Sequence, residues 1–76
     1  MTRDVVLSAR EAEILRHFCA GLSYRRTGLA LGIAESTVKT HRNRLIRKLG
    51  VRDVPEAVAV VRDGEVRITV RDSQPP

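Results

Sequence analysis

Glycines punctuate this chain at short intervals, and they limit the length of any helix that it can form. Gly21, Gly32 and Gly50 each follow a stretch with helical character, and Gly64 breaks a fourth. In the first stretch, the apolar residues at positions 14, 15, 18 and 22 recur at helical spacing. The sequence therefore predicts four short helices, at about residues 9–20, 23–31, 35–49 and 54–62.

Helix starts are marked as clearly as the stops. Ser8 and Glu11 form a capping-box pattern at the start of the first helix, and Asp53 and Glu56 form another before the fourth. Ser23 is in position to cap the second helix. That helix is weak by propensity because residues 27 and 28 are threonine and glycine, and Leu29 and Leu31 are available for its core contacts.

The third predicted helix has two distinct faces. At 100° per residue, Val38, Leu45 and Leu49 fall on one side, with His41 beside them. The opposite side carries polar and basic residues, namely Ser36, Lys39, Thr40, Asn43, Arg44 and Arg47. This separation predicts that the apolar side packs on a core and the basic side remains exposed.

After the helices, residues 65–71 alternate between apolar and polar and predict a β-strand. A single strand needs a pairing partner, and Asp4–Leu7 is the only other β-prone run in the chain. We expect this tail either to pair across a dimer or with a partner's sheet, or to remain unstructured. Residues 73–76, Ser-Gln-Pro-Pro, are expected to form a disordered end.

Charge is concentrated in the middle of the chain. The 76 residues carry a net charge of +5 and have the length of one small domain. Residues 21–52 hold eight cations against Glu35 alone, a net of +7, whereas the remainder is net acidic. Such a distribution favours phosphates as partners, and the alternative is a solvated basic face without a partner.

Several other classes of protein are disfavoured. No apolar run approaches the roughly 20 residues of a membrane span, and the N-terminus does not resemble a signal peptide. The single Cys19 excludes an intramolecular disulfide and suits a reducing cytoplasm. Ser8 and Ser23 lack a His–Asp pair that could activate them, and neither His17 nor His41 has further ligands at metal-binding spacing. We therefore expect a protein that is not an enzyme and that binds no metal ion, cofactor, small molecule or membrane.

Two helices joined by a short turn containing glycine, the second of them basic, describe a helix-turn-helix. Gly32 permits the bend and Ile33 is placed to fill the junction. Beyond this pattern, the chain resembles the DNA-binding domain of LuxR-type transcriptional regulators, the four-helix GerE-like variant of the helix-turn-helix. The stretches that match are Leu7–Leu15, Gly21–Ser23, Thr37–His41, Arg47–Val51 and Ala57–Val58. Two stretches at the ends of the second helix, Gly21–Tyr24 and Leu31–Ile33, also look like the promoter-reading region of sigma factors. The LuxR type is favoured by Lys39-Thr40-His41 and Leu49-Gly50-Val51.

The resemblance implies an all-α, four-helix GerE-like bundle with a short β-prone tail, over a single domain of residues 1–76, without the regulatory domain usual in the family. It implies double-stranded DNA as partner and residues 35–49 as the recognition helix. Base edges would be read by Lys39, Thr40 and Asn43. Phosphates would be contacted by Ser23, Arg25, Thr37, Arg44, Arg47 and Lys48.

The family commonly forms dimers through its fourth helix, which here is rich in small apolar residues. The resemblance therefore implies a homodimer on inverted half-sites, in the cytoplasm and associated with the nucleoid. The residues expected at the dimer interface are Val54, Ala57, Val58, Ala59 and Val61.

The second helix departs from the family pattern. Arg26, Thr27 and Gly28 replace an acidic residue followed by Ile-Ala, which removes a core anchor unless Leu29 compensates. Ala34 stands where a serine usually caps the recognition helix, and Ser36 is an alternative cap for a later start. A second hypothesis for the function is a protein-interaction module of the same fold that binds RNA polymerase, a sigma factor or another regulator. Exposed leucine, methionine or aromatic side chains on the third helix would favour that hypothesis.

Overall fold

A computed structural model describes residues 2–71 and contains four helices and a two-stranded sheet. The elements, in chain order, are β1 (Arg3–Leu7), α1 (Ala9–Cys19), α2 (Tyr24–Leu31), α3 (Glu35–Leu49), α4 (Val54–Arg62) and β2 (Val66–Val70). The four predicted helices are confirmed to within a residue at each end. The expected disordered end, residues 73–76, lies outside the described residues.

The first helix begins with the capping box that the sequence predicts. The Ser8 hydroxyl accepts the Glu11 N–H at 3.1 Å, and a Glu11 carboxylate oxygen accepts the Ser8 N–H at 2.9 Å. The fourth helix differs from the prediction. Asp53 accepts the Glu56 N–H at 3.0 Å, but the Glu56 carboxylate accepts from the N–H of Arg52 and not from that of Asp53. The second capping box is therefore only half formed.

The second helix is held by different residues from those expected. Leu29 is 71% exposed and does not compensate for the missing core anchor, because Thr27 and Gly28 occupy the buried side of the helix. A Cβ atom on Gly28 would lie 2.7 Å from the carbonyl oxygen of Ile33, so glycine is required where α2 meets the turn. Ile33 is half-buried against the core, as predicted.

The third helix begins at Glu35 without a side-chain cap. Ala34 is the N-cap residue and provides no hydrogen bond, and Ser36 does not cap a later start because the helix has already begun. At the other end, the Arg3 guanidinium of β1 donates to the carbonyl of Leu49. A cation at that position satisfies a carbonyl that the helix leaves unpaired and complements the helix dipole.

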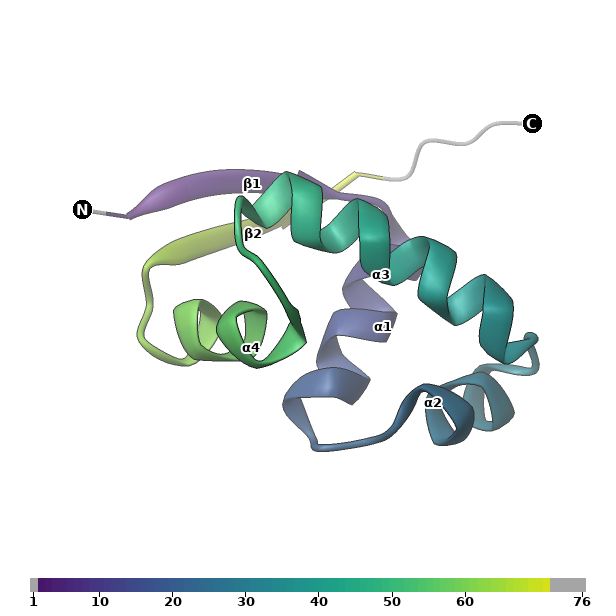
Figure 1. The fold of residues 1–76 in the computed structure, drawn as a ribbon. Coiled ribbons are helices and arrows are strands. Elements are labelled where there is room, and N and C mark those ends of the chain that lie inside the picture. Colours follow the sequence, from purple (N-terminus) through teal and green to yellow (C-terminus); the bar gives the residue numbers. More distant parts are fainter. Residues whose placement is uncertain (1, 72–76) are drawn as a thin grey trace.

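The tail strand pairs within its own chain. β1 and β2 run parallel, with Arg3 opposite Val66 and Leu7 opposite Val70. The sequence identified both strands, but the expectation that the tail would pair with another chain or remain unstructured is wrong. The two strands lie side by side, as Figure 1 shows. A parallel pair requires a long crossover connection, and here the whole helical bundle provides it.

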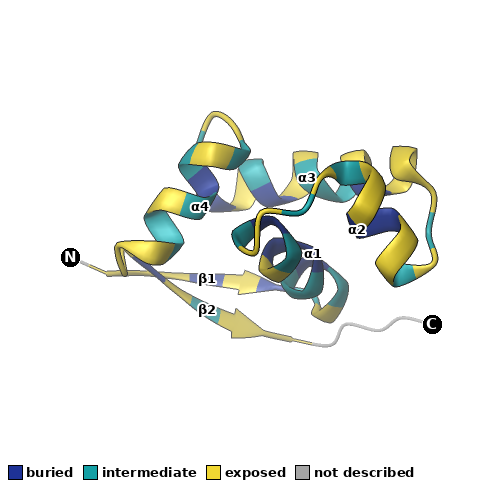
Figure 2. Cartoon of the chain, turned by 90° about the horizontal axis from the view of Figure 1, so that it is seen from below, coloured by how far each residue is buried: buried dark blue, intermediate teal, exposed yellow. Residues whose placement is uncertain are grey.

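The core lies between the sheet and the helices. Its buried apolar residues come from every element except α2, and the dark blue segments of the ribbon in Figure 2 mark the buried positions of the chain. They are Val5, Leu7, Ile14, Leu15, Phe18, Val38, Leu45, Leu49, Ala57 and Val66. One side of α3 packs against α1 and β1 through these core residues, and the other side of α3 remains at the surface.

Candidate nucleic-acid interface

The outer side of α3 is polar, basic and exposed. It is the side that the helical periodicity predicts, since Val38, Leu45 and Leu49 point the opposite way into the core. Seven of the residues predicted to contact DNA lie on α3 and all are exposed, namely Thr37, Lys39, Thr40, Asn43, Arg44, Arg47 and Lys48. The remaining two, Ser23 and Arg25, are exposed at the start of α2. The structure therefore leaves all nine predicted residues exposed, on α3 and at the start of α2.

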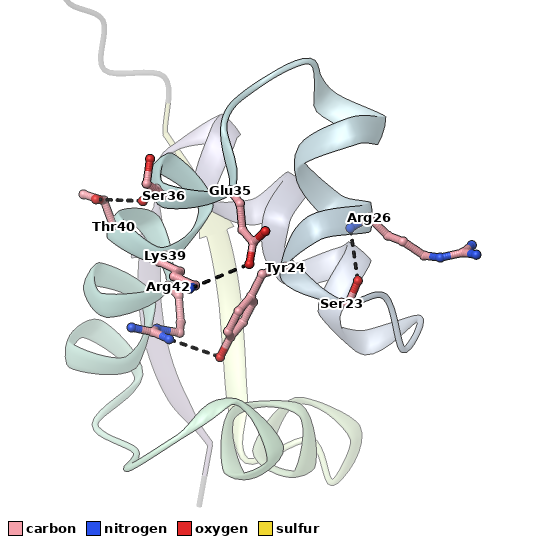
Figure 3. A network of polar contacts seen from close by, with 8 residues as sticks. All are labelled: Ser23, Tyr24, Arg26, Glu35, Ser36, Lys39, Thr40 and Arg42. Carbon is pink, nitrogen blue, oxygen red and sulfur yellow. Dashed lines mark hydrogen bonds and ion pairs between the residues drawn. The ribbon is translucent and has the colours of Figure 1, made fainter.

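Neighbouring residues hold the first turns of this surface in place. The Lys39 ammonium lies 3.7 Å from the Glu35 carboxylate and 5.9 Å from the centre of the Tyr24 ring. The Thr40 hydroxyl donates to the carbonyl of Ser36 at 3.2 Å. Figure 3 shows these contacts side by side. Glu35 therefore partly neutralises the charge of Lys39, and both side chains are about half exposed.

Tyr24 and Arg42 form a contact between α2 and α3 that the sequence analysis missed. The Arg42 guanidinium donates to the Tyr24 hydroxyl at 3.2 Å and lies 5.1 Å from the centre of its ring (Figure 3). Tyr24 in turn packs edge-on against Phe18 at 5.7 Å between ring centres. The available signal was that Tyr24 is the only tyrosine in a chain with just 3% aromatic residues.

Arg42 also controls the orientation of a predicted base-reading residue. Its Nε and Nη2 atoms donate to the carbonyl oxygen of the Asn43 side chain at 3.0 and 2.8 Å. This pair of bonds uses the acceptor of the Asn43 amide and leaves the NH₂ group available as a donor. The contacts therefore link Phe18, Tyr24, Arg42 and Asn43 from the core to the surface of α3.

Ser23 has a structural role in addition to its predicted contact. Its hydroxyl accepts the N–H of Arg26 at 3.1 Å and so caps α2, as Figure 3 shows. A capping serine lies at a helix N-terminus, where unpaired N–H groups attract anions. Arg25 and Arg26 are exposed in the first turn of the same helix.

Lys48 differs from the other predicted phosphate contacts because a protein carboxylate already engages it. Its ammonium lies 2.8 Å from Glu11, which is only 3% exposed. Burial raises the pKa of Glu11, but hydrogen bonds from Lys48 and Ser8 outweigh it and hold the pKa below the usual value. Glu11 is therefore a buried carboxylate that needs Lys48 as its counter-ion.

An open, basic cleft lies beside the outer surface of α3. Its volume is about 570 Å³, and its lining comes from the start of α2, from α3, and from the turn into α4. The lining residues are Tyr24, Arg42, Asn43, Ile46, Arg47, Arg52, Asp53 and Val54. Arg42, Arg47 and Arg52 give the cleft the charge that a phosphate backbone would meet.

His41 and Cys19 lie off this surface. Burial, followed by the nearby charge of Arg44, lowers the pKa of His41, and its Nδ1 atom is buried without a hydrogen-bond partner among the described residues. Burial raises the pKa of the Cys19 thiol, with a smaller opposing effect from Arg62. Within residues 2–71 no three potential ligands come together to hold a metal ion.

The residues predicted for a dimer interface lie on α4 with unequal exposure. Ala59 is exposed, whereas Val54, Val58 and Val61 are partly buried against the core of their own chain. Ala57 is 2% exposed, so it serves that core and has no surface to offer a partner. None of the helices in residues 2–71 has the length and apolar character required to cross a membrane.

Comparison with known proteins identifies the family of this fold and surface. The family described as "Bacterial regulatory proteins, luxR family" matches residues 5–61. A solved structure entitled "Structure of Transcription factor, GerE" superposes with a TM-score of 0.68 at 34% identity, covering 80% of this chain and 92% of that one.

Curated relatives carry names of the same kind. "Probable transcriptional regulatory protein NarL" of Mycobacterium tuberculosis is 52% identical over 54 residues, which are 71% of this chain and 25% of the relative. "Transcriptional regulatory protein DegU" of Brevibacillus brevis is 38% identical over 64 residues, 83% of this chain and 27% of the relative. "Response regulator protein TodT" of Pseudomonas putida is 39% identical over 71% of this chain and 24% of the relative. The chain thus spans about a quarter of the length of these relatives.

The matched region includes α1 to α3 and most of α4, and therefore the whole of the exposed surface described above. This agrees with a regulatory role and not with an enzyme. The chain belongs to the LuxR family of bacterial regulatory proteins.

Proposed function

We propose that this chain is a sequence-specific, double-stranded DNA-binding transcription regulator that places α3 in the major groove. The observation that carries the proposal is the separation of α3 into a buried apolar side and an exposed basic side. Among the described residues of that exposed side there is no leucine, methionine or aromatic residue of the kind that a protein-binding surface requires. The names of the relatives as transcriptional regulators support the proposal.

Base reading is assigned to Lys39, Thr40 and Asn43. A major groove about 12 Å wide admits one α-helix, and these side chains extend from its exposed side. Because Arg42 occupies the acceptor of the Asn43 amide, Asn43 offers donors. We infer that it donates to a purine N7, guanine O6 or thymine O4, and that two-pronged pairing with adenine requires Arg42 to release it.

Phosphate contacts are assigned to the flanks of this surface. Arg44, Arg47 and Thr37 would follow one strand along α3, and Ser23 and Arg25 would follow the backbone at the start of α2. Lys48 is assigned a weaker contact because Glu11 already neutralises it. Such contacts fix the register of the protein on DNA but do not select a sequence.

A homodimer on inverted half-sites is proposed through α4. Ala59 is exposed and Val54, Val58 and Val61 are half-buried, which suits a small contact about a two-fold axis. Ala57 would support that contact from within the core. A protein of this function works on chromosomal DNA in the cytoplasm and, as a regulator, within reach of RNA polymerase.

The test is a selection from random duplex DNA combined with a salt titration. We expect an enriched palindrome and a fall in log K of about 0.9 per phosphate neutralised for each unit of log salt concentration. Asn43→Ala should then relax the selected sequence at one position of each half-site. A steep salt dependence without enrichment would contradict sequence reading. No binding at physiological salt would favour the alternative function, a protein-interaction module.

A further inference from the structure

The outer edge of β2 has no pairing partner in the described part of the chain. The Glu65 carbonyl accepts from Arg3 and the Arg71 N–H donates to Leu7, so the odd-numbered residues of the tail face β1. Successive residues of a strand direct their backbone groups to opposite edges. The N–H and C=O groups of Val66, Ile68 and Val70 therefore point outward, along the side of the sheet that is open in Figure 2.

An apolar groove lies directly beneath this edge. It has a volume of about 350 Å³ between α1, α4 and β2, and Leu15, Cys19 and Val61 form part of its wall. Ile68 and Val70 of β2 also line it, and Val70 remains 53% exposed although its side chain faces the helices. A further strand would pair with the free backbone groups of this edge, and it would also cover part of the apolar groove.

When two copies of the tail are aligned antiparallel, the residues that lie opposite each other are complementary in charge and polarity. About a centre at Ile68, an antiparallel copy places Glu65 opposite Arg71, Val66 opposite Val70, and Arg67 opposite Thr69. We propose that β2 is a self-association surface, at which the β2 strands of two copies pair antiparallel about Ile68 into one four-stranded sheet. This interaction does not use Ala59, the exposed residue of the proposed α4 contact, and it does not depend on the proposed function.

Backbone geometry and charge select this register together. The outward-facing residues 66, 68 and 70 meet one another as hydrogen-bonded pairs, so the backbone requirement is met. Glu65 and Arg71 of the partner then form a non-hydrogen-bonded pair, in which side chains approach most closely. Centring the pairing on residue 67 instead would oppose Arg67 to its own copy, and centring it on 69 would oppose Arg67 to Arg71. Like charges directly opposite are destabilising.

The charged residues that this pairing uses are available. Glu65 and Arg71 are exposed and make no ion pair within residues 2–71, whereas Arg67 is already 3.8 Å from Asp4 on the neighbouring strand. Val66, Ile68 and Val70 lie on the face of the sheet that is turned toward the helices. In the pair, these residues of both copies would form one apolar stripe over the two grooves. Figure 2 places α3 and β2 on opposite sides of the molecule, so paired copies keep both DNA-binding surfaces exposed.

A charge exchange tests the proposal with the full chain in the absence of DNA. The dissociation constant for self-association is measured by sedimentation at low salt and up to millimolar concentration. Glu65→Arg and Arg71→Glu each oppose like charges twice in the symmetric pair and should weaken association about tenfold. The double variant, E65R with R71E, restores two opposite-charge pairs and should recover the affinity of the original chain.

Two further variants separate the edge from other causes. Val70→Pro removes an outward-facing N–H without removing a bond to β1, so it should abolish association while the thermal unfolding of the monomer is retained. Ala59→Glu on α4 is the matched control: it disrupts the proposed α4 contact, and the effects of E65R, R71E and their combination should be the same in its background. A monomer at millimolar concentration, or a double variant as weak as the single ones, would overturn the proposal. If only A59E loses association, the contact between copies lies on α4, and the proposal is overturned as well. The proposed function is judged separately, by selection from random duplex DNA, and none of these results decides it.

Discussion

The Lys48 ammonium lies 2.8 Å from the carboxylate of Glu11, which is almost fully buried beneath it. Lys48 comes from α3 and Glu11 from the first turn of α1, where the same carboxylate also closes the capping box with Ser8. One carboxylate thus joins the start of α1 to the end of α3. A lysine that resembles a phosphate contact in the sequence is therefore also part of the fold.

Lys48→Met should lower the free energy of unfolding by about 1 kcal/mol, because Glu11 loses one hydrogen-bond partner but keeps Ser8. The salt dependence of DNA binding should change little. Arg47→Ala is the matched variant, since Arg47 is exposed and makes no ion pair among the described residues. It should leave stability unchanged and lower the salt slope by about 1. Urea unfolding and salt titrations measure both, and an equal loss of slope in the two variants would contradict the assignment of Lys48.

Gly28→Ala should destabilise the fold by about 1–3 kcal/mol, because the new methyl group would lie 2.7 Å from the Ile33 carbonyl oxygen. Alanine is otherwise the better helix former, so helix propensity alone predicts a stabilisation of about 1 kcal/mol. The next residue provides the control. Leu29→Ala should cost less than about 0.5 kcal/mol because Leu29 is exposed. Thermal unfolding measures both variants. A destabilised Gly28→Ala would show that packing decides its stability, whereas a stabilised one would show that helix propensity does.

Thr27→Val should stabilise the protein by about 1 kcal/mol. The Thr27 side chain is fully buried, and its hydroxyl has no hydrogen-bond partner among the described residues. Valine has nearly the same shape and removes the cost of burying an unpaired polar group. Thr37→Val, at an exposed position of α3, is the control and should be close to neutral. A loss of stability in Thr27→Val would show that the hydroxyl has a partner, such as a bound water molecule.

The sequence predicted what is local in this fold. Ser8 and Ser23 cap their helices, Gly50 ends α3, and the periodicity of α3 separates its buried side from its exposed side, because each signal acts within a few residues. The contacts that were missed join distant positions. Lys48 and Glu11 are 37 residues apart, and Arg42 and Tyr24 are 18 apart. Neither pair has a spacing rule, since the packing angle between helices decides which side chains meet.

The parallel sheet shows the same limit. Both strands were recognisable from their alternation, but Arg3 and Val66 meet only because the intervening helices return the chain to its start. The exposure of Leu29 likewise depends on how closely α2 approaches the turn, and Gly28 sets that distance. Local patterns identified the elements, and tertiary packing decided their partners.

Arg42→Met should change the base that Asn43 selects. Without the guanidinium, the Asn43 carbonyl oxygen becomes available, and the amide can then pair two-pronged with adenine. Selection from random duplexes should therefore show an increase in adenine at that position of the half-site. Tyr24→Phe is the milder control because it removes one hydrogen bond at 3.2 Å but keeps the ring beneath Arg42. An unchanged preference in Arg42→Met would mean that Arg42 does not orient Asn43 on DNA.

The stability of the protein should fall as the pH drops below about 6.5, and His41 is the reason. Burial, and next the nearby Arg44, lower the pKa of His41 in the folded state. The unfolded chain therefore binds a proton at a higher pH than the folded chain does, and the stability that neutral His41 provides is lost between the ordinary pKa and the lowered one. Glu11 adds a separate loss at more acidic pH, since its pKa is also lowered and its stabilisation disappears as it is protonated.

Urea unfolding between pH 5 and pH 7.5 measures the first of these losses, and His41→Gln should flatten the curve over that interval because glutamine does not titrate. His17 is the internal control. His17→Gln makes the same exchange on α1, where the Nδ1 atom lies 2.8 Å from the Glu13 carbonyl oxygen, and so controls for the substitution itself. If the dependence persists in His41→Gln, the titrating group is not His41.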